Sequence, residues 1–126
     1  MINFWNKVTK YKEARYAAGM NFDLEEIEPF LNHLSNSILD SGLTQEEINM
    51  ILSEISEIDK MNEDNEIKEF GTFDVIYKGK PSKIRVQAEI HIEDGDKELV
   101  LYMYSTKKLV DVIEKEMLKV EEQREF

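Results

Sequence analysis

The sequence predicts an α+β fold with N-terminal helices, including an acidic helical hairpin, followed by a three-stranded antiparallel β-meander and a C-terminal helix. Three observations support this fold class: apolar residues recur at helical spacing up to about residue 62, alternate with polar residues after Glu66, and return to helical spacing after Ser105. A chain of 126 residues has the usual size of one domain. We therefore expect a single domain over 1–126, mainly helical over 1–62, with a sheet over 67–104 and a helix over 106–122.

The first helix is predicted over residues 3–18. Its apolar face is formed by Phe4, Trp5, Val8 and Tyr11, and Gly19 ends it. Next, Asp23 and Glu26 have the spacing of a capping box. Because Pro29 cannot donate a backbone hydrogen bond, we expect only a short turn before it and the main second helix from Pro29 to Asp40.

The third helix has the clearest start signal in the chain. Thr44 is a good N-cap residue and Glu47, three positions later, completes a capping box, while Leu43 can pack on Ile48 as a hydrophobic staple. Isoleucine and leucine side chains then form one continuous stripe up to Ile58. The second and third helices should therefore form an antiparallel hairpin.

Two hairpins are predicted in the second half of the chain. Asp94-Gly95 is typical of a type I′ turn, and a turn there pairs Ile90 with Leu99, Ala88 with Leu101 and Val86 with Met103 on one face. For the earlier hairpin, a four-residue loop over 78–81 pairs Phe73 with Val86, Val75 with Ile84 and Asp74 with Arg85. Ser105 or Thr106 then caps the final helix.

The opposite face of the predicted sheet is more apolar than a solvated surface requires, because it carries Ile76, Val100, Tyr102 and Tyr104. Either the N-terminal helix covers this face or the face binds a partner, since tyrosine is a favoured interface residue. The third strand also has a free edge in this arrangement. A homodimer could form through that edge strand, Leu99–Tyr104.

Composition excludes several classes of function. The net charge is -11, and residues 19–69 contain fourteen acidic and two basic residues, so we expect no direct binding to nucleic acid. The absence of cysteine excludes disulfides and thiolate catalysis. No stretch approaches the ~20 apolar residues that cross a bilayer. We therefore expect a cytoplasmic protein with no membrane contact and no cofactor.

One strand presents a candidate metal site. Glu89, His91 and Glu93 alternate along the strand on the face opposite Ile90, and the predicted register places Glu98 across from His91. One imidazole and three carboxylates are a ligand set that suits manganese, iron or zinc. The alternative interpretation is a solvated strand face with a cross-strand pair of histidine and glutamate.

The leading hypothesis is a small non-enzymatic protein-binding module of the inhibitor, immunity or chaperone type, whose acidic helical surface binds a basic protein partner. One version is a DNA mimic of phage or mobile-element origin. The alternatives are a metal-dependent enzyme centred on the strand face above and a homodimeric structural protein. The predicted partner-binding residues are Glu25, Glu26, Glu28, Glu46, Glu47, Glu54, Glu57, Asp59, Tyr102 and Tyr104.

Overall fold

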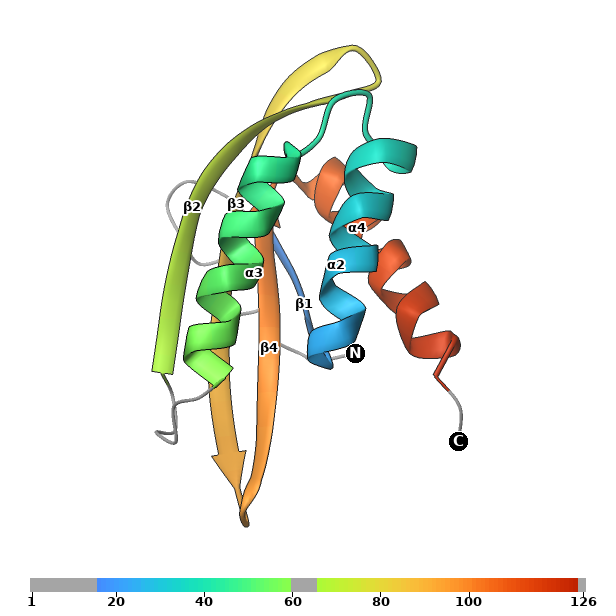
Figure 1. The fold of residues 1–126 in the computed structure, drawn as a ribbon. Coiled ribbons are helices and arrows are strands. Elements are labelled where there is room, and N and C mark those ends of the chain that lie inside the picture. The colour runs from blue at the N-terminus through green and yellow to red at the C-terminus, as the bar shows by residue number, and fades with distance from the viewer. Residues whose placement is uncertain (1–15, 60–65, 125–126) are drawn as a thin grey trace.

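A four-stranded antiparallel sheet forms the base of the fold, and helices cover one of its faces (Figure 1). The computed structural model describes residues 16–59 and 66–124. The strand order is β1-β4-β3-β2. The elements are β1 (Tyr16–Asn21), α2 (Leu24–His33), the π-helix η1 (Leu34–Ile38), α3 (Gln45–Asp59), β2 (Glu66–Tyr77), β3 (Lys80–Glu93), β4 (Asp96–Ser105) and α4 (Lys107–Glu122). The predicted α+β class is confirmed, whereas the predicted number of strands, three, is wrong.

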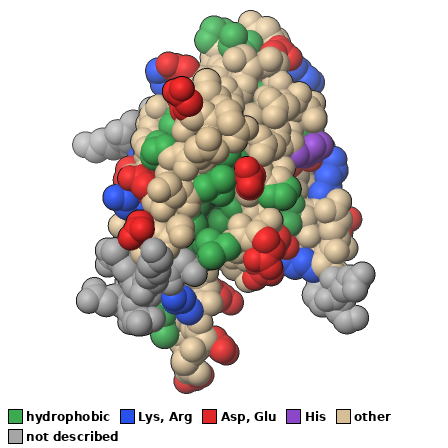
Figure 2. Space-filling model, in the orientation of Figure 1, with side chains coloured by type: hydrophobic (Ala, Val, Ile, Leu, Met, Phe, Trp, Pro, Cys, Tyr) green, Lys and Arg blue, Asp and Glu red, His purple; other side chains and the backbone are tan. Residues whose placement is uncertain are grey.

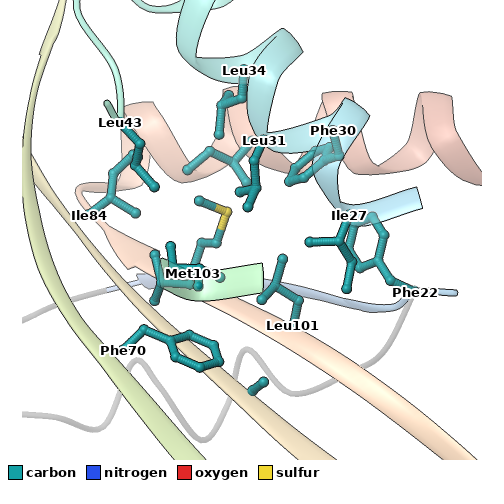
Figure 3. Close-up of a cluster of buried hydrophobic side chains, with 14 of the residues drawn as sticks. Phe22, Ile27, Phe30, Leu31, Leu34, Leu43, Phe70, Ile84, Leu101 and Met103 are labelled. Atoms are coloured by element: carbon teal, nitrogen blue, oxygen red, sulfur yellow. The ribbon is translucent and has the colours of Figure 1, made fainter. Parts of the chain in front are cut away.

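The hydrophobic core lies between the sheet and the helices. Buried side chains of α2, α3 and α4 join buried side chains of all four strands in one cluster, so every α-helix of the described residues packs on the same sheet face. Figure 3 shows Ile27 and Leu31 of α2 pointing toward Leu101 and Met103 of β4. Burial of this apolar surface is the main favourable contribution to the free energy of folding.

The β3–β4 hairpin has the predicted register. Ile90 pairs with Leu99, Ala88 with Leu101 and Val86 with Met103. The turn residues Asp94 and Gly95 both have positive φ angles, 53° and 84°, which is the conformation that a type I′ turn requires. This prediction is confirmed because the turn sequence and the apolar alternation specify the same pairing.

The β2–β3 hairpin differs from the prediction by two residues. Lys78 and Gly79 form a two-residue turn, so Phe73 pairs with Ile84 rather than Val86, and Val75 pairs with Ser82 rather than Ile84. Asp74 consequently lies opposite Lys83, with 2.6 Å between its Oδ1 and the lysine Nζ, and not opposite Arg85 as predicted. Because a two-residue shift keeps every side chain on its face, the core face was still predicted correctly.

Residues 16–21 form strand β1, where the sequence predicts the end of a helix over 3–18. β1 pairs antiparallel with β4, with Ala18 opposite Met103 and Met20 opposite Leu101. The helix prediction is therefore wrong for Tyr16–Ala18, and its remainder, residues 3–15, lies outside the described residues. Alanine and glycine have little intrinsic preference for strands, so the exposed edge of β4 and burial decide the structure here.

The pairing of β1 also occupies the edge on which the homodimer prediction depends. Val100–Ser105 pair with β1, and the N–H of Phe22 donates a hydrogen bond of 2.9 Å to the carbonyl of Leu99. The predicted edge strand, Leu99–Tyr104, is thus an inner strand of the sheet. A second copy cannot pair there without displacing β1.

Helix α2 begins at Leu24 and continues through Pro29, where the sequence predicts that the main helix begins. Glu26 Oε1 accepts a hydrogen bond of 2.9 Å from the N–H of Asp23, which fixes the first turn as the capping-box signal predicts. Because Pro29 has no backbone N–H, the carbonyl four residues before it lacks its helical donor. Pro29 is exposed, so water can hydrate that carbonyl. The helix changes to π geometry at its end, where the N–H of Leu39 donates to the carbonyl of Leu34 at 3.0 Å.

The predicted helix starts at Thr44 and Thr106 are confirmed. The N–H of Thr44 donates to Glu47 Oε1 at 2.8 Å, and the N–H of Glu47 donates to Thr44 Oγ1 at 3.1 Å. At the other start, Thr106 Oγ1 accepts a hydrogen bond of 3.3 Å from the N–H of Leu109. These side-chain oxygens satisfy backbone donors that have no partner within the helix.

The segment between η1 and α3 is held against the end of β2. Ser41 and Ile76 exchange backbone hydrogen bonds of 2.8 and 3.2 Å, and Ser35 Oγ accepts a hydrogen bond of 3.1 Å from the N–H of Leu43. A Cβ atom added at Gly42 would lie against Cα of Ser35 and 2.6 Å from its Cβ. Only glycine fits this close approach without moving the backbone.

Replacing Gly42 with alanine should lower the free energy of unfolding by about 1–3 kcal/mol, because the added methyl group forces the loop away from Ser35. Urea denaturation of the purified variant measures this difference. Asn36→Ala, at an exposed position of η1, is the control and should leave the midpoint close to that of the unmodified protein. Equal midpoints for the two variants would contradict the proposed steric constraint.

Candidate functional site

The segment that contains α2, η1 and α3 carries most of the net negative charge of the chain. Residues 24–59, from the start of α2 to the end of α3, contain nine acidic residues and no lysine or arginine. By contrast, residues 66–105, which include β2, β3 and β4, contain eight acidic and six basic residues. The nine acidic residues are Glu25, Glu26, Glu28, Asp40, Glu46, Glu47, Glu54, Glu57 and Asp59.

Several of the predicted partner-binding carboxylates have partners within the described residues. Glu26 binds Arg124, Glu47 caps the start of α3, and Glu54 Oε1 lies 3.6 Å from Lys68 Nζ. These side chains contribute to the stability of the fold, so they are less available to a partner. The Asp59 side chain lies outside the described residues.

The exposed carboxylates of α2 and α3 form a surface that we call the acidic helical face: Glu25, Glu28, Glu46 and Glu57. Within the described residues, the first three have no ion pair with a basic side chain. Figure 2 shows hydrophobic side chains gathered in the middle of this side of the molecule, with carboxylates spaced around them. Leu24 on α2 and Met50 on α3 are exposed by 41% and 37%.

A groove of about 500 Å³ runs between α2 and α4. Its apolar part is formed by Pro29, Phe30 and Val120, and Phe30 is almost completely buried. Charged and polar side chains lie around this apolar part. We call this feature the α2–α4 groove, and its lining residues are Glu25, Glu26, Pro29, Phe30, His33, Glu116, Lys119, Val120, Gln123 and Arg124.

At one end of the groove a buried carboxylate joins the two helices. The Glu116 side chain is only 6% exposed, and its Oε1 lies 3.0 Å from His33 Nε2. Its other oxygen, Oε2, accepts a hydrogen bond of 3.1 Å from Lys119 Nζ. Because a buried carboxylate without partners is unfavourable, the contact with His33 helps to fix α2 against α4.

At the other end of the groove, Arg124 joins three elements. Its Nη2 donates to Glu26 Oε1 at 2.8 Å and to the carbonyl of Asn21 at 2.7 Å, and its Nε donates to Glu26 Oε2 at 3.0 Å. The hydrogen bonds from Arg124 hold the pKa of the Glu26 carboxyl below its usual value, although burial acts in the opposite direction. The start of α2, the end of β1 and the segment after α4 therefore share one guanidinium.

Tyr102 and Tyr104 lie on the outer sheet face, the face opposite the helices, as predicted. Tyr104 is buried and its ring lies under the Arg85 guanidinium, with 4.5 Å between the ring centroid and Cζ. Arg85 Nε is also 2.9 Å from Glu69 Oε1, an ion pair without hydrogen-bond alignment. Burial raises the pKa of the Tyr102 phenol above its usual value, and the charge of Glu89 and a hydrogen bond to it raise it further.

The structure brings together only part of the predicted metal site. His91 Nε2 lies 3.9 Å from Glu89 Oε1, and Glu98 is the register partner of His91 as predicted. However, the described residues contain no group of three histidine, aspartate or glutamate side chains that could hold a metal ion. The Glu89 carboxylate interacts with Tyr102, a neighbour that the prediction did not include. Glu93 is exposed near the end of β3.

Sequence reasoning missed the α2–α4 groove because its two polar pairs join residues that are 83 and 98 positions apart.

Within the described residues, no helix has both the length and the apolar character needed to cross a membrane. Comparison with family models, curated proteins and solved structures finds no match to this chain. The charge distribution and the groove are the features of the described residues that bear on function.

Replacing Glu26 with glutamine should reduce the dependence of stability on pH in acid. Because the folded-state pKa of Glu26 is lowered, the ionised carboxylate stabilises the fold above its ordinary pKa of 4.5, and this stabilisation is lost as the pH falls through the lowered value. We expect the unmodified protein to lose about 1 kcal/mol more than the variant between about pH 6 and about pH 3. Thermal or urea unfolding over this range measures the difference.

Glu25→Gln removes a neighbouring carboxylate that has no ion pair within the described residues. This control should keep the acid dependence of the unmodified protein. If Glu26→Gln and Glu25→Gln show the same dependence, the bond between Glu26 and Arg124 does not control acid stability.

Proposed function

We propose that this protein is a non-enzymatic binding module that recognises a basic protein partner through the acidic helical face. The observation that carries this proposal is the charge of residues 24–59, nine acidic residues with no lysine or arginine, on the layer that faces away from the sheet. Clustered carboxylates accelerate association with a basic partner and repel acidic ones. This is the mode of action expected of an inhibitor, an immunity protein or a chaperone.

The exposed apolar side chains of the same two helices support a protein partner. Leu24 and Met50 are large, exposed hydrophobic residues on α2 and α3, the helices that carry the acidic helical face. Apolar contacts contribute to affinity, whereas the surrounding charges contribute mainly to specificity and to the rate of association. A basic protein surface with apolar residues in its centre meets both requirements.

A specialised version of the proposal is DNA mimicry, in which the carboxylates of α2 and α3 occupy the phosphate-binding surface of a nuclease or regulator encoded with a phage or mobile element. Its support is the same charge distribution, because surfaces that bind DNA are rich in lysine and arginine. Duplex DNA would then compete with this protein for its partner. A partner that binds both at once would contradict mimicry while leaving the protein-binding proposal intact.

Reversing one exposed charge on each helix, Glu28→Lys with Glu46→Lys, should abolish salt-sensitive capture of the partner. The tagged protein is incubated with lysate of its native cell at low and moderate salt, and bound proteins are identified by mass spectrometry. We expect one dominant basic protein for the unmodified chain and at least a tenfold loss, on the order of 1.4 kcal/mol, for the variant. Neither residue caps a helix or has an ion pair within the described residues, so folding should be unaffected.

The matched control is Glu93→Lys with Asp96→Lys at the tip of the β3–β4 hairpin, which projects beyond the helices in Figure 1. Glu93 and Asp96 are register partners, so the double reversal keeps like charges opposite each other and changes the net charge by the same amount. Capture should survive in this control. Equal loss in both double variants, or capture of no basic protein by the unmodified chain, would contradict the proposed function.

A further inference from the structure

We infer that the α2–α4 groove is the anchor site for an arginine-containing apolar segment of the basic partner. The inference rests on the proposed function and adds to it a defined position and a class of ligand. It follows from the shape of the groove, from the contacts that fix its ends, and from the charge near the start of α2.

The size and lining of the groove suit a small number of side chains. Its volume of about 500 Å³ lies within the range of pockets that hold a compact ligand. Pro29, Phe30 and Val120 form an apolar surface against which the aliphatic part of an arginine, or a neighbouring leucine or aromatic residue, can lose contact with water. The residues that dominate binding energy at interfaces fill well-packed pockets from which water is excluded, and arginine is prominent among them.

The groove is fixed before a ligand arrives. The contact of His33 with Glu116 joins α2 to α4 at one end, and the double hydrogen bond of Arg124 to Glu26 joins α2 to the segment after α4 at the other. A ligand therefore does not have to order these side chains, and less of the binding free energy is lost to conformational entropy.

Charge near the start of α2 selects a cation. Arg124 binds Glu26, and the charges of Glu26, Asp23 and Glu121 act on its guanidinium. Glu25 lines the groove and adds a carboxylate for which the described residues provide no ion pair. Lys119 does not offset this charge, because it is held by Glu116 at the opposite end. An added guanidinium fits better than an ammonium, because its planar shape can pack on an apolar surface while it binds a carboxylate.

Fluorescence anisotropy tests the inference with the full chain and a short labelled peptide in which arginine and leucine alternate. Glu25→Lys and Glu46→Lys are matched variants, because both residues are exposed and both occupy the second position of their helix, after Asp23 and Thr44. Their effects on helix stability through the helix dipole should therefore be similar. Only Glu25 lines the groove.

We expect Glu25→Lys to weaken peptide binding about tenfold, and Glu46→Lys to weaken it by less than about twofold. Val120→Asn, which changes the apolar surface without changing charge, should also weaken binding about tenfold. Thermal unfolding confirms that each variant is folded. A second peptide with citrulline in place of every arginine has nearly the same shape without the charge and should bind at least about tenfold more weakly.

The remaining outcomes separate the inference from the proposed function. Equal weakening by Glu25→Lys and Glu46→Lys would overturn the groove as the anchor site and leave a general acidic surface. Equal binding of the citrulline peptide would overturn both, since charge would then play no part. If the unmodified protein binds neither peptide, the inference is overturned, and the capture experiment decides the proposed function independently.

Discussion

Burial of one face of the sheet is the constraint on which the rest of the structure depends. β3 and β4 have a closely spaced apolar set, including Ile90, Leu101 and Met103, that must be removed from water, and α2, α3 and α4 all pack on it. Because the apolar stripes of α2 and α3 pack on the sheet, the charged residues of these two helices point outward. The same packing brings α2 beside α4, which creates the groove. Charge layer and groove are thus both consequences of covering a single sheet face with helices.

Local chemistry explains which parts of the fold could be predicted from the sequence. The start of α3 and the β3–β4 register were predictable because each depends on residues a few positions apart, such as Thr44 with Glu47 and Asp94 with Gly95. β1 was not predictable, because its alanines and glycine do not favour strand structure. Pairing with the edge of β4 makes this segment a strand. The Lys78-Gly79 turn was missed since lysine rarely adopts the positive φ angle, 51°, that it has here. Pro29 misled because burial of Ile27, Phe30 and Leu31 offsets the cost of the helical hydrogen bond that the proline removes.

The candidate site was predictable in part for the same reason. The concentration of acidic residues is a property of the sequence, and so is the amphipathic pattern that turns them outward. Which carboxylates remain available is a tertiary property: Glu26 is paired because Arg124, 98 residues later, returns to the start of α2. Glu89 likewise has the Tyr102 phenol as a neighbour, because a diagonal pair across β3 and β4 places them on one face. Alternation along one strand predicts the sheet face on which a side chain lies, but it does not predict which side chain of the neighbouring strand lies beside it.

The one-sided distribution of charge gives the molecule a permanent electric dipole moment in addition to its net charge. Residues 24–59 contribute a charge of nine carboxylates on one side of the sheet, while the strands behind them are close to neutral. In the field of a basic surface this asymmetry produces a torque as well as an attraction, so the protein rotates during its approach until the helices lead. Collisions with such a surface then begin with the acidic helical face presented. Orientation of this kind depends on the distribution of charge over the whole domain and not on the area of any one contact.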